Sequence, residues 1–126
     1  KYGAVNDEVE LEITGGIRIT AIITHDSTLN LGLQPSSEAF ALIKASSIIV
    51  ATDFQGARFS ARNQLAGTIA RVQAGAVNTE VVIDLPGGGA LAAIVTNESS
   101  QTLGLAVGKP ATGLFKASSV ILGVPA

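Results

Sequence analysis

The architecture follows from two related stretches, Gly3-Ala-Val-Asn-Asp-Glu-Val-Glu-Leu-Glu-Ile13 and, further along the chain, Gly75-Ala-Val-Asn-Thr-Glu-Val-Val-Ile-Asp-Leu85. They open a longer repeat, in which 22 of the 48 positions from 3–50 are identical to those from 75–122 without a gap. So many identities at one offset indicate a duplicated unit. We therefore expect two similar modules, residues 1–54 and residues 60–126, in this chain of 126 residues.

The two copies differ at their beginnings. The second copy opens with residues 60–72, whose counterpart in the first copy would occupy the 13 positions before Lys1. The first module is therefore expected to lack its leading strand, through truncation, processing or rearrangement. Residues 51–59 form a short junction between the copies.

Alternating residues predict strands. Val9, Leu11 and Ile13 alternate with glutamates in the first copy, as expected for a strand with one buried face. The glycine pairs that follow, Gly15-Gly16 and Gly87-Gly88, suit hairpin turns. By the same criteria, further strands are expected at 17–24, 39–44 and 48–51 in the first copy and at 65–74, 79–85, 90–96, 111–116 and 120–124 in the second.

Each copy also predicts one short helix. Thr24 and Thr96 open polar segments that can cap a helix, and Gly32 and Gly104 end it. Three strands, a short helix and two strands is the element order of an OB-type barrel. The predicted fold is all-β: two tandem five-stranded OB-type barrels, each with one short helix, the first without its leading strand. A copy of about 65 residues buries only some 60% of its unfolded surface, so we expect a homo-oligomer.

The composition excludes several function classes. Charged residues make up 14% of the chain, aromatic residues make up 4%, and the net charge is −2. These values disfavour a nucleic-acid partner. The longest apolar stretches, such as residues 90–95, are about six residues long, and a membrane span needs roughly 20. There is no cysteine, so neither a disulfide nor a thiolate metal site is expected.

Little in the sequence suggests catalysis. His25 is the only histidine, and the second copy has Asn97 in its place, which favours a surface or capping role over a general base. Glu8, Glu10 and Glu12 share one strand face and fit a solvated edge better than a cation site. We expect no enzyme, no phosphate-binding loop and no metal site.

The polar positions that both copies retain are more informative. The one basic position among them is the lysine of Lys44-Ala-Ser-Ser47 and Lys116-Ala-Ser-Ser119. A cation followed by two hydroxyls can hold a small oxyanion. The alternative is structural: a lysine that ends a strand, followed by a Ser-Ser turn. Ser60-Ala-Arg-Asn63 adds a hydroxyl, a guanidinium and an amide within four residues.

Several motifs in order resemble the molbindin (Mop) family, whose module is also known as the TOBE domain. They are Ser60-Ala-Arg-Asn63, Leu65-Ala-Gly-Thr-Ile69, Gly75-Ala-Val-Asn78, Ala93-Ile-Val-Thr96, Leu103-Gly-Leu105 and Lys116-Ala-Ser-Ser119. The resemblance covers nearly the whole chain, twice. Two copies in one small chain resemble the di-Mop molybdate-binding proteins of the bacterial cytoplasm.

The resemblance implies sites for molybdate or tungstate between modules. The residues it implies are Ser60, Ala61, Arg62 and Asn63, paired with Lys116, Ala117, Ser118 and Ser119 or with Lys44, Ala45, Ser46 and Ser47. A second type of site near subunit axes would use Ala4, Val5 and Asn6 together with Ala76, Val77 and Asn78. The first copy has no Ser-Ala-Arg-Asn segment of its own, so up to half of the first type of site is expected to be incomplete.

By resemblance, the chain binds molybdate or tungstate for intracellular storage in the cytoplasm, as a trimer of two-module chains. One rival is a molybdate-sensing regulatory module of a transcription factor or of a transporter ATPase. Another is a structural or oligosaccharide-binding barrel, which would have no affinity for oxyanions.

Overall fold

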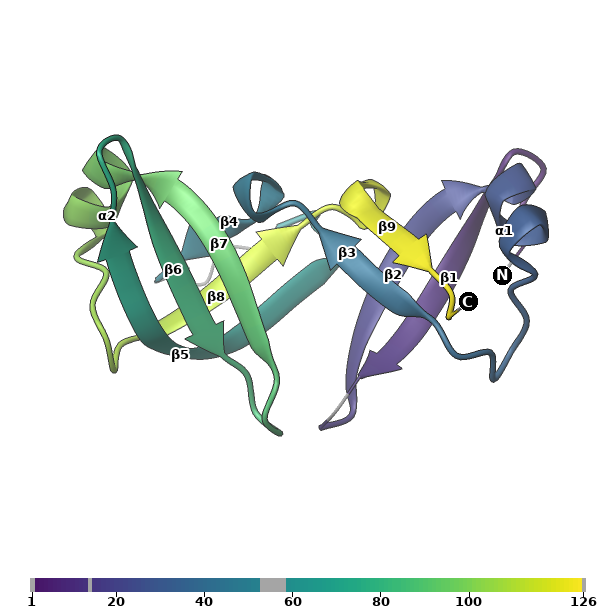
Figure 1. Cartoon of the computed structure of the whole chain (residues 1–126), viewed down its shortest axis with the longest axis horizontal. Helices are drawn as coiled ribbons and strands as arrows, with labels where there is room; N and C mark the ends of the chain where they lie inside the picture. Colours follow the sequence, from purple (N-terminus) through teal and green to yellow (C-terminus); the bar gives the residue numbers. More distant parts are fainter. Residues whose placement is uncertain (1, 14, 53–58, 126) are drawn as a thin grey trace.

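The computed structural model describes residues 2–13, 15–52 and 59–125, and most of the expected junction lies outside these ranges. The chain forms two barrel modules placed end to end, with one helix at each far end (Figure 1). In the first copy the elements are β1 (Asn6–Ile13), β2 (Ile17–Thr24), α1 (His25–Leu31), β3 (Phe40–Ile43), the 3₁₀ turn η1 (Ala45–Ser47) and β4 (Ile49–Ala51). In the second copy they are β5 (Asn63–Ala74), β6 (Asn78–Asp84), β7 (Ala90–Thr96), α2 (Asn97–Leu103), β8 (Pro110–Phe115), the 3₁₀ turn η2 (Ala117–Ser119) and β9 (Val120–Gly123).

These elements confirm the predicted all-β fold and the two short helices. Thr24 caps α1 by accepting a hydrogen bond from the Ser27 N–H, and Thr96 caps α2 in the same way. Gly32 and Gly104 end the helices in the left-handed conformation, with φ of 66 and 64 degrees, a backbone region that glycine enters without a steric penalty. Among the described residues, neither helix has the length and apolar character needed to span a bilayer.

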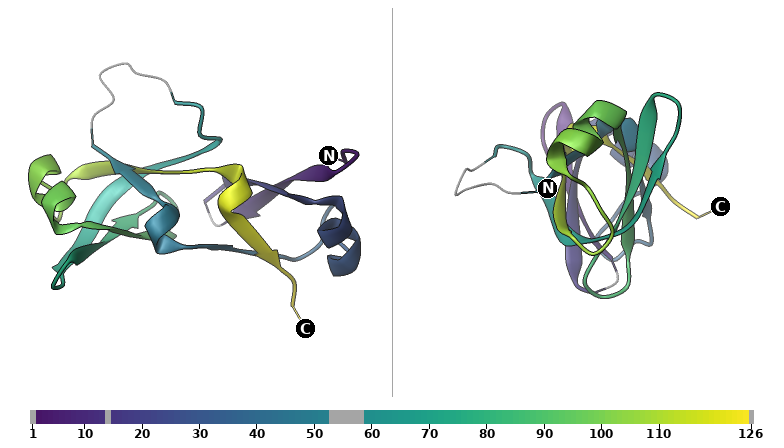
Figure 2. Two further views of the ribbon diagram at one scale, coloured as in Figure 1. Left: turned by 90° about the horizontal axis from the view of Figure 1, so that it is seen from above. Right: turned by 90° about the vertical axis from the view of Figure 1, so that its left-hand side faces the viewer.

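The last strand of each copy pairs with the other copy. β9 runs antiparallel to β3 of the first copy, and β4 runs antiparallel to β8 of the second. One barrel therefore contains β1, β2, β3 and β9, and the other contains β4, β8, β5, β6 and β7 in that sheet order. Figure 2 shows the two copies crossing over at the centre of the molecule. The sequence repeat does not reveal this exchange, because β4 and β9 are equivalent strands and either could pair with β3 or β8.

The two cores differ in completeness. In the five-stranded module the inward residues of β5, β6 and β7 are fully buried, among them Ile69, Val81 and Ile83. In the other module Ala21 of β2 is buried, whereas Val9 and Leu11 of β1 are only partly covered. In this module β1 has β2 as its only strand partner among the described residues, whereas β6 of the other module lies between β5 and β7.

One buried amide connects the modules directly. Asn63, at the start of β5, is 2% exposed. Its side chain accepts a hydrogen bond from the Thr20 N–H and donates one to the Thr20 carbonyl, each 2.8 Å long. Both backbone groups of a β2 residue are thus satisfied by one side chain of the other module.

Replacement of Asn63 by alanine should destabilise the chain. Asn63→Ala removes both partners of the Thr20 peptide groups, and each buried group left without a partner costs about 1–3 kcal/mol. We expect the free energy of unfolding, measured by urea denaturation, to fall by about 3 kcal/mol. Gln64→Ala, an exposed neighbour on β5, serves as the control and should change it by less than about 0.5 kcal/mol. Equal effects of the two substitutions would contradict this role for Asn63.

A polar cluster links β1 to α1 in the first module. Asp7 is buried and accepts hydrogen bonds from the Gly3 N–H at 2.8 Å and from the His25 ring at 2.9 Å. Burial raises the pKa of the Asp7 carboxyl, but the hydrogen bonds from Thr28, Gly3 and His25 and the charge of His25 outweigh it. They lower the pKa from 3.8 to about 2. His25 is therefore a partner of Asp7, and Thr24 is the helix cap.

This pKa shift predicts a loss of stability in acid. Because the pKa in the folded state lies below the ordinary value of 3.8, Asp7 stabilises the fold above that pH. Its contribution is lost as the pH falls to about 2. Urea unfolding between pH 5 and pH 2 should show this decline.

The second copy supplies the matched control, since it has Thr79 and Asn97 at these positions, joined by a hydrogen bond. The double variant Asp7→Thr with His25→Asn should keep the fold and lose that part of the pH dependence. An unchanged pH profile in the double variant would show that Asp7 is not the responsible group.

Candidate functional site

The two Lys-Ala-Ser-Ser segments form the same local structure. Each lysine directly follows a strand and has an extended backbone, and the next three residues make a 3₁₀ turn. The Ser47 N–H donates to the Lys44 carbonyl at 2.8 Å, and the Ser119 N–H donates to the Lys116 carbonyl at 2.9 Å. Through the strand exchange, η2 packs against β2 of the first copy and η1 packs against β7 of the second.

A pocket of about 570 Å³ lies where η2 meets the segment that leads into β5. It brings together the start of the Ser60-Ala-Arg-Asn63 segment and the whole of the Lys116-Ala-Ser-Ser119 segment. Ser47 joins them from the first copy, and Ile22 comes from β2. The full lining is Ile22, Ser47, Ile49, Phe59, Ser60, Ala61, Arg62, Leu114, Phe115, Lys116, Ala117, Ser118 and Ser119.

The polar groups of this pocket suit an anion. Arg62 and Lys116 are its two cationic residues, and four serines supply hydroxyl donors. No carboxylate belongs to the described lining. Among the described residues, the Lys116 side chain has no hydrogen-bond or ion-pair partner. Arg62 donates to Glu8 of the other module, an ion pair that holds the guanidinium at the module boundary.

Asn63 has a different position from its three predecessors. Its amide is taken up by the Thr20 backbone and is not part of the pocket lining. The structure thus places Ser60, Ala61 and Arg62 at the pocket, whereas Asn63 fixes the segment against β2.

The other predicted site residues lie outside this pocket. Of the first lysine segment, Ser47 alone belongs to the described lining, and Lys44, Ala45 and Ser46 do not. The two Ala-Val-Asn turns lie at opposite ends of the molecule, one beside α1 and the other beside α2 (Figure 1). Their valine carbonyls accept hydrogen bonds from the first residue of each helix, His25 and Asn97. One chain does not bring residues 4–6 and 76–78 together.

Sequence reasoning missed the apolar half of the pocket. Ile22 and Ile49 come from the first copy, and Phe59, Leu114 and Phe115 from the second. No local signal marks them, because their proximity results from the strand exchange. The role of Glu8 was also missed: it is half-buried and paired with Arg62, whereas Glu10 and Glu12 are exposed as expected.

A larger cavity of about 720 Å³ has the opposite character. Its described lining contains five carboxylates and no lysine or arginine. The carboxylates belong to Asp7, Glu8, Glu10, Glu12 and Glu38. Size therefore does not identify the anion site, since a dianion would be repelled here. Within the described ranges, no three acidic or histidine side chains are grouped to hold a metal ion.

Comparisons with known proteins identify the family of the chain. The family model of the TOBE domain matches residues 2–50 and 60–122. The chain is 50% identical over 123 residues to the molybdenum-pterin-binding protein MopA of Rhodobacter capsulatus, a match that covers 98% of this chain and 46% of MopA. It is 37% identical over 109 residues to the DNA-binding transcriptional dual regulator ModE of Escherichia coli K12, covering 86% of this chain and 40% of ModE.

A solved structure resembles almost the whole chain. The cytoplasmic molybdate-binding protein ModG, crystallised with molybdate bound, superposes with a TM-score of 0.96 at 44% identity, covering 99% of this chain and 89% of ModG. The chain spans about half the length of MopA and ModE. With two matches of the family model, one in each half of the repeat, the chain belongs to the TOBE domain family.

Proposed function

We propose that the chain binds molybdate or tungstate reversibly, for storage and homeostasis, and catalyses no reaction. The observation that carries this proposal is the pocket between η2 and residues 59–62, with two cationic side chains, four hydroxyls and no carboxylate in its described lining. Lys116 and Arg62 supply charge, and Ser47, Ser60, Ser118 and Ser119 supply directional donors.

The donor set favours a fully deprotonated tetrahedral dianion. Every polar side chain in the described lining can donate a hydrogen bond, so the pocket offers donors to the oxygens of molybdate or tungstate. A protonated phosphate turns one O–H toward these donors, which costs about 1–3 kcal/mol. Sulfate has no such proton and is smaller, so its rejection rests on the size of the pocket.

The relatives support the same ligand class. MopA is named for binding a molybdenum-pterin, and ModG is a molybdate-binding protein. ModG is also described as cytoplasmic, and we place this chain in the same compartment. The similarity to ModE favours a second candidate, in which the same modules sense molybdate for a regulator. Both candidates share the anion site and differ in what the anion controls.

We further propose that the chain works as a homo-oligomer, with a trimer of two-module chains favoured. Ile49 and Ile121 occupy equivalent positions in the repeat and are 66% and 63% exposed. Leu42, opposite Ile121 in the β3–β9 pair, is 57% exposed. Apolar side chains exposed together on the crossover strands are typical of a subunit interface. Such contacts between chains are where Lys44, Ala45, Ser46 and the two Ala-Val-Asn turns would contribute to sites.

Calorimetric titration tests the anion site. Molybdate and tungstate should each bind saturably, and phosphate should bind at least about tenfold more weakly because of its proton. An intact oligomer that releases no heat with molybdate would exclude the proposed function.

A lysine substitution then tests the position of the site. Lys116→Ala removes a charge-assisted hydrogen bond worth about 1.5–3 kcal/mol, so the affinity for molybdate should fall by about 10- to 100-fold. Lys109→Ala is the control, since Lys109 bonds the Gly104 carbonyl and lies outside the pocket lining. If both variants retain full affinity, the anion binds elsewhere.

The interface proposal predicts that charge will dissociate the assembly. Introducing aspartate at two exposed apolar positions, in the double variant Ile49→Asp with Ile121→Asp, should convert the oligomer to single chains. Light scattering coupled to gel filtration measures the mass directly. The barrels should remain folded, because both isoleucine side chains are exposed and lie outside the core. Circular dichroism checks this. A folded variant of unchanged mass would place the interface on another face.

A further inference from the structure

Glu8 of the first module contacts the anion pocket through one residue of its lining. The Glu8 carboxylate accepts a hydrogen bond from Nη2 of Arg62, which is one of the two cationic residues of that lining. The Glu8 side chain is 26% exposed and the Arg62 side chain is 50% exposed. Among the described residues, this is the only ion pair that Arg62 forms. A negative charge is thus held beside a pocket whose own described lining contains none.

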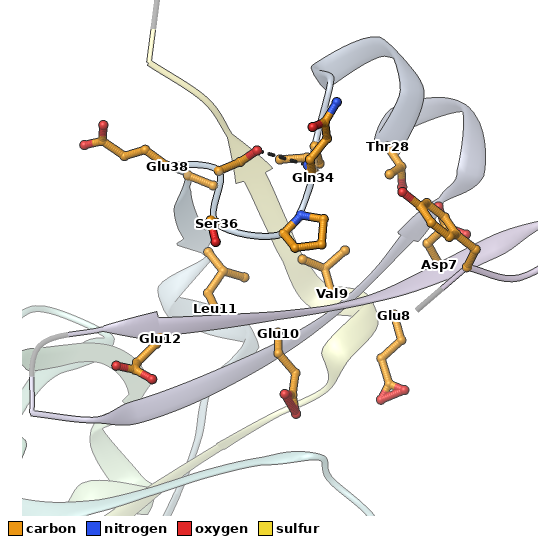
Figure 3. Close-up of a pocket in the computed structure, with 15 residues that line it drawn as sticks. Asp7, Glu8, Val9, Glu10, Leu11, Glu12, Thr28, Gln34, Ser36 and Glu38 are labelled. Atoms are coloured by element: carbon orange, nitrogen blue, oxygen red, sulfur yellow. Dashed lines mark hydrogen bonds between the residues drawn. The ribbon is translucent and has the colours of Figure 1, made fainter.

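The alternation of β1 places Glu8 on the pocket side of the strand. Figure 3 shows Glu8 on one side of β1 and Val9 and Leu11 on the other, where these two apolar side chains pack against the core. In the β1–β2 pair Glu8 lies opposite Ile22, which lines the pocket. Residues directly opposite each other in an antiparallel pair share a face of the sheet. The carboxylate therefore lies on the face that borders the pocket.

The residue after Arg62 fixes its backbone against the same strand pair. Asn63 accepts one hydrogen bond from the Thr20 backbone and donates one to it, each 2.8 Å long. Thr20 lies on β2, two positions before Ile22 of the pocket lining. The Arg62 side chain thus extends from an anchored backbone, with Glu8 on one side of its guanidinium and the pocket beside it.

The charges of an occupied site would not balance. Lys116 and Arg62 supply two positive charges, whereas a bound dianion and Glu8 together supply three negative charges. A guanidinium has five N–H donors, so Arg62 can bond to the anion and keep Glu8. Two anions bonded to one guanidinium are closer together than the Debye length of about 8 Å, so salt screens their repulsion only in part.

We propose that Glu8 is a specificity-determining residue of the anion site, a fixed counter-charge that weakens binding more strongly the higher the charge of the anion. This inference rests on the proposed function and concerns the same pocket. It gives Glu8 the role of keeping a bound dianion exchangeable. A pocket that balanced the dianion completely would release it more slowly, because affinity differences between related complexes lie mostly in the dissociation rate.

The opposite role, in which Glu8 assists binding by holding Arg62 in place, is the weaker effect. Immobilising one side chain in advance is worth at most about tenfold in affinity. The repulsion between a carboxylate and a dianion on the same guanidinium is larger, because the second charge of the dianion doubles it and water reaches only part of the Glu8 side chain. Removing the charge of Glu8 should therefore tighten binding.

The repeat supplies a matched control. Glu80 occupies the equivalent position in the second copy, lies opposite Ile94 in the β6–β7 pair and forms an ion pair with Arg71. Arg71 does not belong to the described lining of the pocket. Glu80→Gln thus removes the same charge from the same kind of ion pair without touching the anion site.

Calorimetric titration with two tetrahedral oxyanions of different charge tests the proposal. Molybdate carries two negative charges and perrhenate carries one. Glu8→Gln keeps the shape of the side chain and an acceptor oxygen for Arg62. It should raise the affinity for molybdate by about tenfold and the affinity for perrhenate by about threefold, because the repulsion scales with the charge of the anion. Glu80→Gln should change either affinity by less than about twofold, as expected for a screened surface charge.

Three results would overturn the role of Glu8. The first is unchanged or weaker binding of molybdate by Glu8→Gln. The second is an equal gain for molybdate and perrhenate, since a purely structural change does not depend on the charge of the anion. The third is an equal gain in Glu80→Gln, which would assign the effect to net charge.

The same titrations separate this inference from the proposed function. If the parent chain binds no molybdate, the proposed function fails and the role of Glu8 fails with it. If the parent chain binds molybdate and Lys116→Ala weakens that binding, while Glu8→Gln has no effect, the role of Glu8 alone is wrong.

Discussion

The exchange of the final strands is the constraint on which the rest of the structure depends. β4 and β9 each leave their own copy and complete the sheet of the other, so both 3₁₀ turns are drawn to the centre of the chain. This crossing sets η2 against β2 and brings Ser47 of the first copy to Lys116 of the second. Without it, the two cations and four hydroxyls of the pocket would not share one lining. The Asn63 amide, bonded to both backbone groups of Thr20, secures the same boundary.

Covalent linkage changes the thermodynamics of such an exchange. In two separate chains, swapping the last strands is a bimolecular event that depends on concentration. Within one chain it becomes intramolecular, with an effective concentration in the millimolar range or above for short connections. Because each barrel contains a strand of the other copy, loss of one barrel removes a strand from its neighbour, so the two cores are coupled in unfolding.

The helices and strands, and some of the residues that line the pocket, could be predicted from the sequence. The strands were predictable because alternation and glycine turns are local signals, and the helices because a threonine cap and a left-handed glycine lie close together in the chain. The exchange was not predictable, since β4 and β9 derive from equivalent positions of the repeat and either fits β3 or β8. For the same reason the sequence did not predict that Ile22 and Ile49 line the pocket. It also did not predict the ion pair between Glu8 and Arg62. These contacts join residues of different copies.

The polar cluster at the start of each helix has diverged between the copies. At the start of α1, Asp7 is hydrogen-bonded to His25, and at the start of α2, Thr79 is hydrogen-bonded to Asn97 in the equivalent place. The duplication produced two similar modules, and this pair of substitutions makes their helix-start clusters chemically unequal: the α1 cluster contains the buried Asp7 carboxylate, and the α2 cluster has the Thr79 hydroxyl in its place. The two ends of the molecule are therefore not interchangeable. Protonation of Asp7 changes the α1 cluster, and the α2 cluster has no carboxyl at the equivalent position to protonate.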